Sequence, residues 1–395
     1  MVAADNALIH WIEDGQPCSA RWRSESGVPA PKRVQVADDR MDADSAYRLA
    51  CEGVGLLWRG DFQNARQLLQ ALARRIDRPA PAKRSRLKKD AAPVIAIAAQ
   101  PFHLHRQAQS QRARTLGMLL LPHDSDHGVP LRRAPDVRQA CSDAYGAASE
   151  PYVASMRELL GLIGAFEWRK NGVPVAALGE KIHPHYGVFA PIRAEYVDLI
   201  ARAPLPAGAS ALAFDIGTGT GVLAAVLARR GVDKIIATDQ DPRALACARE
   251  NLERLGLTQV ELLQADLFPP GRDSESGPAR AGLIVCNPPW LPARPSSPIE
   301  HAVYDPDSCM LRGFLQGLPA HLAPGGEGWL ILSDLAEHLE LRSRESLMAM
   351  FADAGLRVID RHDIRPQHPR VSDTEDVLHK ARAAEVTSLW RLAVL

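Results

Sequence analysis

The stretch ALAFDIGTGTGVLAAVLARRGVDKIIATD, residues 211–239, decides the fold of the larger part of this 395-residue chain. The short apolar runs at 211–217 and 234–239 predict two strands. The intervening TGVLAAVLARR has the pattern of a helix. Two strands joined through one helix run parallel in a single sheet, so this stretch predicts a βαβ unit.

The same alternation of strand and helix continues toward the end of the chain. Further strands are predicted in VELLQAD (260–266), GLIVCNPP (282–289) and WLILSD (329–334). The runs 356–364 and 386–395 lack a full crossover helix between them, which predicts an antiparallel pair at the sheet edge. We therefore expect an α/β fold with a doubly wound, Rossmann-like sheet over the core 180–395.

A glycine-rich turn, DIGTGTG at residues 215–221, follows the first of these strands. This turn lies at the carboxyl edge of the sheet, where glycines let the backbone approach a ligand closely. The spacing differs from the G-x-G-x-x-G of dinucleotide sites because Val222 stands where the third glycine is needed. An acidic residue followed by Gly217, Gly219 and Gly221 instead resembles the first motif of class I S-adenosylmethionine-dependent methyltransferases.

This resemblance implies a site for S-adenosyl-L-methionine at the strand ends. Asp239 matches the acidic residue that accepts both ribose hydroxyls in the family, and Asp266 with Leu267 matches the segment that meets adenine. Without a cofactor, Asp239 would cap the helix that starts near Pro242, and Asp266 would be a turn residue. The cofactor-binding residues that the resemblance implies are Phe189, Asp215, Gly217, Thr218, Gly219, Gly221, Asp239, Asp266, Leu267 and Asn287.

Upstream of the sheet, HYGVFAP at 185–191 resembles the segment of glutamine and nucleic-acid amino-methyltransferases that lines the methionine end of the cofactor. The resemblance implies that role for Phe189 and Pro191. The proline-rich loop from 291 to 306 has the length of a substrate lid, from which Tyr304 and Asp305 are candidates to reach the substrate.

The fourth strand ends in Asn287-Pro288-Pro289-Trp290, which matches the [DNS]-P-P-[FYW] loop of methyltransferases that modify planar nitrogens. Such a nitrogen shares its lone pair with a conjugated system and needs acceptors for its two N–H groups. The resemblance implies that the side-chain carbonyl of Asn287 and the backbone carbonyl of Pro288 accept them. Pro289 would rigidify the loop and Trp290 would stack on a planar substrate. The alternative is that both residues have only structural roles, Asn287 in a turn at the end of the strand and Trp290 as an aromatic of the core.

Residues 1–150 are expected to form a mainly helical accessory domain for substrate recognition, followed by a methyltransferase domain over 151–395. Amphipathic patterns over 44–76 predict an αα-hairpin joined at Gly60 and Asp61. The accessory domain of such enzymes normally determines substrate specificity. Residues 1–150 resemble neither the release-factor glutamine methyltransferases nor the rRNA guanine N2 methyltransferases, the two groups that the core resembles.

Positive charge is concentrated in one part of the chain. Between residues 58 and 138 there are sixteen Lys and Arg against six Asp and Glu, although the whole chain has 47 of each class. The basic segment 78–138 is suited to contact a phosphate backbone. The alternative is an ordinary solvated surface with a linker.

These features favour an N-methyltransferase acting on a planar exocyclic amine, with a nucleic-acid base, most readily of RNA, as the first hypothesis. The alternative is a protein glutamine N5-methyltransferase that resembles the release-factor enzymes and takes a ribosome-associated protein as its substrate. The pattern also resembles the small-domain rRNA guanine N2 methyltransferases. The glutamine enzymes end the motif in tyrosine, so Trp290 counts against that alternative. A small-amine substrate and a non-catalytic domain that only binds cofactor or RNA are further possibilities.

Composition excludes several other classes of protein. With 46% hydrophobic and 24% charged residues, the chain is expected to be globular. No apolar run approaches the roughly 20 residues of a membrane-spanning helix, and the first residues lack a signal-peptide pattern. We therefore expect a cytoplasmic protein without a membrane partner. The six cysteines are dispersed, and the His123/His127 and His183/His185 pairs lack a third ligand, so no metal is expected.

Overall fold

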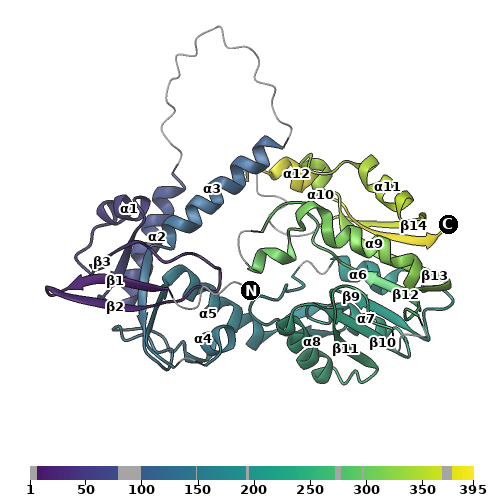
Figure 1. Cartoon of the computed structure of the whole chain (residues 1–395), viewed down its shortest axis with the longest axis horizontal. Helices are drawn as coiled ribbons and strands as arrows, with labels where there is room; N and C mark the ends of the chain where they lie inside the picture. Colours follow the sequence, from purple (N-terminus) through teal and green to yellow (C-terminus); the bar gives the residue numbers. More distant parts are fainter. Residues whose placement is uncertain are drawn as a thin grey trace, which may run out of the picture. The chain divides into compact units, whose positions relative to one another are not determined.

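The computed structural model describes residues 7–78, 99–147, 149–192, 195–271, 277–295, 298–366 and 376–395. The chain separates into two compact units, Met1–Glu167 and Trp168–Leu395 (Figure 1). The sequence placed the boundary at 150/151. In the structure it falls later along the chain, because strand β6 (Tyr152–Ser155) pairs within the sheet of the first unit.

The first unit is built on a six-stranded mixed sheet in the order β1-β2-β6-β5-β4-β3. Besides β6, its strands are β1 (Leu8–Glu13), β2 (Gln16–Trp22), β3 (Arg33–Ala37), β4 (Val54–Trp58) and β5 (Leu119–His123). Its helices are α1 (Ala43–Cys51), α2 (Phe62–Ile76), α3 (Gln100–Leu116), α4 (Arg138–Tyr145) and most of α5 (Met156–Asn171), whose last residues belong to the second unit. The expectation of a mainly helical accessory domain is therefore wrong.

The αα-hairpin predicted over 44–76 is interrupted by a strand. Helix α2 begins as expected after Asp61, whose side chain accepts a hydrogen bond from the backbone of Gln63. Helix α1, however, ends before Gly53, and all five residues of the following β4 are buried between β3 and β5. A five-residue apolar run fits a helix or a strand equally well by periodicity, and here its burial in the middle of a sheet decides for the strand.

The second unit contains a seven-stranded sheet in the order β11-β10-β9-β12-β13-β15-β14. Its strands are β9 (Ala213–Ile216), β10 (Ile235–Asp239), β11 (Val260–Gln264), β12 (Ala281–Cys286), β13 (Leu322–Ser333), β14 (Leu356–Ile364) and β15 (Thr387–Val394). Strands β9 to β13 are parallel, and β15 runs antiparallel to both β13 and β14. This confirms the doubly wound sheet with its antiparallel edge. The strand order reverses between β9 and β12, and ligands bind at such a switch point.

Helices and short elements surround this sheet. The helices are α6 (Glu195–Arg202), α7 (Val222–Arg229), α8 (Pro242–Arg254), α9 (Cys309–His321), α10 (Leu335–His338), α11 (Arg344–Asp353) and α12 (His379–Ala384). The short elements are the hairpin β7 (Val173–Val175) with β8 (Glu180–Ile182), and the 3-10 turns Pro298–Ala302 and Pro306–Ser308. Among the described residues, no helix combines the length and apolar character needed to cross a membrane.

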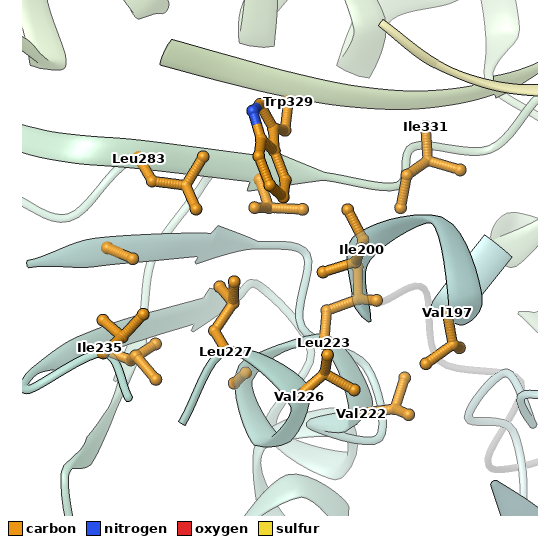
Figure 2. Close-up of a cluster of buried hydrophobic side chains, with 14 of the residues drawn as sticks. Val197, Ile200, Val222, Leu223, Val226, Leu227, Ile235, Leu283, Trp329 and Ile331 are labelled. Carbon is orange, nitrogen blue, oxygen red and sulfur yellow. The ribbon is translucent and has the colours of Figure 1, made fainter. Parts of the chain in front are cut away.

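Alternate side chains along the strands point to opposite faces of the sheet and pack into two separate hydrophobic cores. Leu283 and Val285 of β12 belong to the cluster that also contains α6 and α7, whereas Ile284 and Cys286 belong to the cluster that contains α9 and α11. Figure 2 shows the first cluster, in which Val197 and Ile200 of α6 lie near the buried face of α7 together with Trp329. The strands are thus covered on both faces, and only their ends are available to form a site.

Candidate active site

The glycine turn joins β9 to α7 at the carboxyl edge of the sheet. Gly217, Gly219 and Gly221 have φ angles of 72°, 55° and 79°, a region that residues with a Cβ rarely adopt. A Cβ on Gly217 would lie 2.7 Å from Cε of Met310, and one on Gly221 would lie 3.2 Å from Cβ of Ala248. A Cβ on Gly219 would meet nothing within 4 Å. The positive φ angles favour glycine at all three positions, and a Cβ would in addition crowd Ala248 at Gly221, whereas at Gly217 it would meet only the flexible end of Met310. Gly219 faces open space where a ligand can approach the backbone.

Asp215 is a buried carboxylate immediately before this turn, with only 1% of its surface exposed. Its Oδ2 accepts hydrogen bonds from Oγ1 of Thr218 at 2.7 Å and from the backbone N of Ala224 at 3.1 Å. Its Oδ1 is buried and has no partner among the described residues. Burial raises the pKa of Asp215 to about 6. An unsatisfied buried acceptor is costly, so this oxygen fits a ligand that donates an N–H, as the amino-acid end of S-adenosylmethionine does.

Asp239 closes β10 beside the same turn. Its Oδ2 accepts from the backbone N of Gly219 and its Oδ1 from the backbone N of Asp241, both at 3.0 Å. Burial raises the pKa of Asp239. Each oxygen keeps a free lone pair, so the carboxylate fits the two hydroxyls of a ribose. The alternative role of Asp239 as a helix cap is wrong, because Asp241 caps α8 by accepting from the backbone N of Arg243.

The segment after β11 turns sharply at Leu267, whose φ is 72°. Asp266 is exposed, whereas Leu267 is partly buried against α9, with its Cδ1 2.6 Å from the position of a Cβ on Gly313. Phe268 stacks on His321 with ring centroids 4.2 Å apart. The apolar part of the segment is therefore anchored on α9, and the carboxylate of Asp266 is left at the surface.

The Asn287-Pro288-Pro289-Trp290 loop leaves β12 next to the glycine turn. The register of the two strands pairs Cys286 with Ile216, so Asn287 and Gly217 start from the same line of the sheet edge. Oδ1 of Asn287 accepts a hydrogen bond from Nε1 of Trp290 at 2.9 Å. No pattern in the sequence predicts this bond. An amide oxygen has two lone pairs, so Oδ1 can still accept one N–H from a substrate.

Trp290 is partly buried and packs against both hydrophobic clusters. Its backbone carbonyl accepts a hydrogen bond from Nη2 of Arg342 at 3.4 Å. It therefore combines the position of a core aromatic with a place in the loop, and only part of its ring is available to a substrate.

Two further residues near this loop have roles that the sequence did not reveal. Asp305 is buried, and its two oxygens accept from the backbone N–H groups of Met310 and Leu311, so it caps the start of α9. Arg342 is only 7% exposed, although the polar stretch around it has the composition of a surface. No sequence pattern distinguishes this arginine from its exposed neighbours.

Upstream of the sheet, Phe189 is 42% exposed and Pro191 is buried. Nε2 of His185 lies 2.9 Å from Oε2 of Glu250, and the backbone N of His183 donates to Asn251. In the part of the chain that the structure describes, no three His, Cys, Asp or Glu side chains converge as metal ligands.

Comparison with known proteins agrees with this arrangement. Residues 180–354 match the family model of the methyltransferase small domain. A release factor glutamine methyltransferase of Cereibacter sphaeroides is 36% identical over 129 residues, covering 29% of this chain and 44% of the relative. A release factor glutamine methyltransferase of Geobacter sulfurreducens is 30% identical over 170 residues, covering 40% of this chain and 54% of the relative. A ribosomal protein L11 methyltransferase of Pelotomaculum thermopropionicum is 40% identical over 75 residues, covering 19% and 22%.

The chain spans about half the length of the two glutamine methyltransferases that it matches. The match to the domain family contains the glycine turn, Asp239, Asp266 and the N-P-P-W loop, all of which lie at the ends of strands of the second sheet. The buried free oxygen of Asp215 and the open side of Gly219 fit the cofactor of that family. Residues 180–354 are therefore similar to the methyltransferase small domain, and the motifs and site that they carry fit an S-adenosylmethionine-dependent methyltransferase domain of the N-P-P-[YFW] group.

Proposed function

We propose that this protein methylates the side-chain amide nitrogen of a glutamine in a protein substrate. The observation that carries this proposal is the position of Asn287 and Pro288 at the end of β12, level with the glycine turn. Two carbonyl oxygens are offered there beside the cofactor site. The relatives named as release factor glutamine methyltransferases support the choice of glutamine.

The residues of the loop act on the substrate nitrogen. S-adenosylmethionine supplies an electrophilic methyl group on a positively charged sulfur. Asn287 accepts one N–H of the glutamine amide through the free lone pair of Oδ1, and the carbonyl of Pro288 accepts the other. Holding both N–H groups turns the nitrogen lone pair out of conjugation and orients it for attack. No general base in direct contact is needed, because the nitrogen loses its proton readily once it is methylated.

The remaining site residues would hold the cofactor. Asp215 would accept from its ammonium group through the free Oδ1, and Asp239 would accept from the ribose hydroxyls. Asp266 would accept from the exocyclic amine of adenine, while Leu267 covers the ring. Phe189 would line the methionine end, and its 42% exposed ring has apolar surface available for that contact.

Two features disfavour the nucleic-acid base that the sequence placed first. Arg112 forms an ion pair with Asp77, Arg138 with Asp126, and both Arg132 and Arg133 with Asp61. These arginines therefore contact carboxylates of the chain itself, which reduces their attraction for phosphates. Residues 79–98 of the basic segment lie outside the described residues. The second feature is that Trp290 is partly buried and offers only part of its ring for stacking on a base.

We further propose that the substrate is a protein associated with the ribosome and that the reaction takes place in the cytoplasm. The test is transfer of labelled methyl from S-adenosylmethionine to total protein, and separately to total RNA, from cells lacking this gene. We expect label in protein, on a glutamine that mass spectrometry finds one methyl group heavier. The Asn287→Ala variant should deposit none, while Asn64→Ala, a change on α2 of the first unit, should behave as wild type. Label that appears only in RNA would overturn the proposal in favour of a nucleic-acid base.

A further inference from the structure

The orientation of the Asn287 amide is set by one hydrogen bond. Nε1 of Trp290 donates to Oδ1 of Asn287 at 2.9 Å. An indole nitrogen only donates, so this bond requires the oxygen end of the amide to lie toward Trp290. The two ends of an asparagine amide have nearly the same shape. Without this donor, a half-turn about the last bond would exchange Oδ1 for Nδ2, and an NH2 group cannot accept an N–H from a substrate.

The indole is in turn held in place from two sides. Its ring packs between the two hydrophobic clusters, and the backbone carbonyl of Trp290 accepts from Nη2 of Arg342 at 3.4 Å. The same guanidinium donates through Nη1 to Oγ of Ser308 at 3.4 Å. Arg342 thus connects the N-P-P-W loop to the turn that precedes α9.

Arg342 is a buried cation beside the N-P-P-W loop. It is 7% exposed, and its Nε is buried without a hydrogen-bond partner in the described part of the chain. Burial lowers the pKa of its guanidinium. Among the described residues no carboxylate forms an ion pair with Arg342, although the charges of Glu337 and Asp305 raise its pKa from a greater distance. Burying a charged group in such surroundings is costly. Its two hydrogen bonds to the loop and to Ser308 are the contacts that distinguish this position.

We propose that Trp290 and Arg342 are positioning residues for Asn287. Arg342 holds the backbone of Trp290, and the indole N–H of Trp290 keeps the amide of Asn287 turned so that Oδ1 rather than Nδ2 is offered to the substrate nitrogen. This proposal rests on the proposed role of Asn287 in methyl transfer. It also gives a reason for tryptophan at the end of the motif, because a phenylalanine would supply a ring but no donor.

The first test reads the hydrogen bond directly and needs no substrate. In the full-length protein labelled with ¹⁵N, the indole N–H resonance of Trp290 is identified by its loss in Trp290→Phe. Asn287→Ala should shift this resonance and speed its exchange with solvent, and Arg342→Met should do the same to a smaller extent. Trp329 is the internal control, because its Nε1 donates to Glu327 and should not respond. A Trp290 resonance that is unchanged in Asn287→Ala would overturn the proposal.

The second test separates orientation from stacking. Trp290→Phe keeps a ring, and losing one hydrogen bond of ordinary strength should lower kcat about three- to tenfold. KM and the affinity for S-adenosylmethionine should stay within about twofold of wild type. In the Asn287→Asp background the same change should have no further effect on kcat, because a carboxylate has an oxygen at both ends. An equal fall in kcat in both backgrounds would mean that Trp290 acts by stacking, and would overturn the proposal.

Two comparisons guard against a general loss of folding. Arg342→Lys keeps a donor near the carbonyl of Trp290 and should recover most of the kcat lost in Arg342→Met, at an equal melting temperature. Trp168→Phe removes a 42% exposed indole elsewhere in the unit and should leave kcat unchanged. If no protein substrate is methylated at all, the proposed function fails, and the resonance experiment still decides the positioning role. If the Asn287→Asp variant has no measurable activity, the resonance experiment likewise decides whether Trp290 positions Asn287.

Discussion

Asp61 in the first unit and Asp215 in the second are both carboxylates with 1% exposed surface, and their surroundings are opposite. Oδ2 of Asp61 contacts Nε of Arg132 at 2.9 Å and Nε of Arg133 at 2.6 Å, while its Oδ1 accepts from the backbone of Gln63. The hydrogen bond from Arg133 is the largest cause that lowers the pKa of Asp61, to about 2. Among the described residues Asp215 forms no ion pair with a cation, and burial raises its pKa to about 6.

The two carboxylates differ in whether both of their oxygens have hydrogen-bond partners within the protein. Both oxygens of Asp61 have hydrogen-bond partners within the chain, so Asp61 stabilises the start of α2 and the loop that carries Arg132 and Arg133. Asp215 accepts hydrogen bonds from Thr218 and Ala224 through Oδ2, and its buried Oδ1 has no donor among the described residues. Buried polar groups without partners concentrate at functional sites, because a ligand supplies the missing bond.

The largest effect that distinguishes the two carboxylates is expected in cofactor binding. Asp215→Asn keeps an oxygen for Thr218 and Ala224 but turns an NH2 group toward the ligand ammonium. Losing a charge-assisted hydrogen bond of about 2–3 kcal/mol should weaken the binding of S-adenosylmethionine roughly 30- to 150-fold. Isothermal titration calorimetry measures this, with Asp61→Asn as the matched control that should bind normally. An unchanged affinity in Asp215→Asn would make Asp215 a purely structural residue.

The second effect is on stability as a function of pH. The raised pKa of Asp215 means that the folded protein holds its proton more tightly than the unfolded chain does. Its contribution to stability is therefore full below about pH 4 and is lost as the pH rises through about 6. Between pH 4 and pH 7, the unfolding free energy of wild type relative to Asp215→Asn should fall by about 2 kcal/mol. Urea unfolding at a series of pH values checks the sign, and a difference that rises with pH would contradict it.

The opposite sign is expected for Asp61. Its lowered pKa means that it stabilises the fold above about pH 4, and that this contribution is lost as the pH falls toward 2. At pH 7, Asp61→Asn should lower the melting temperature by a few degrees, because Arg132 and Arg133 lose their shared partner. Thermal unfolding followed by circular dichroism at pH 7 and at low pH tests this. A melting temperature that drops equally at both pH values would show that the charge of Asp61 is not the cause.

The two units also differ in how far the sequence predicted them. The strands of the second sheet are short apolar runs, most of them separated by helical patterns, and β9 to β12 each end at a recognisable motif, so local sequence was sufficient for the fold. The first unit has no such spacing. Its strand β4 lies between two helices and has the composition of a helix core, and only its pairing with β3 and β5, which are distant in sequence, makes it a strand.

The site was predictable where backbone position decides it and not where side-chain packing does. The glycines, Asp239 and Asn287 follow from their place at strand ends. The free oxygen of Asp215 and the bond between Trp290 and Asn287 depend on side-chain rotamers that no pattern encodes. Arg342 comes from a polar stretch and becomes buried only through packing beside the loop. The roles of these residues toward cofactor and substrate stay predictions.

The smallest expected effect concerns the basic segment and sharpens the contrast between paired and unpaired charge. Arg112 binds both oxygens of Asp77, at 2.8 and 2.9 Å, on a partly exposed surface. An exposed pair of this kind contributes no more than about 1 kcal/mol, so Arg112→Gln should change the unfolding free energy only slightly. Because the guanidinium is already neutralised by Asp77, the retention of RNA at low salt should also stay the same.

Asp77→Asn frees the same arginine without removing it and should, if anything, increase retention. Filter binding at two salt concentrations measures both variants. A clear loss of RNA binding in Arg112→Gln would mean that the arginine leaves Asp77 for phosphate, and would return the nucleic-acid hypothesis to first place.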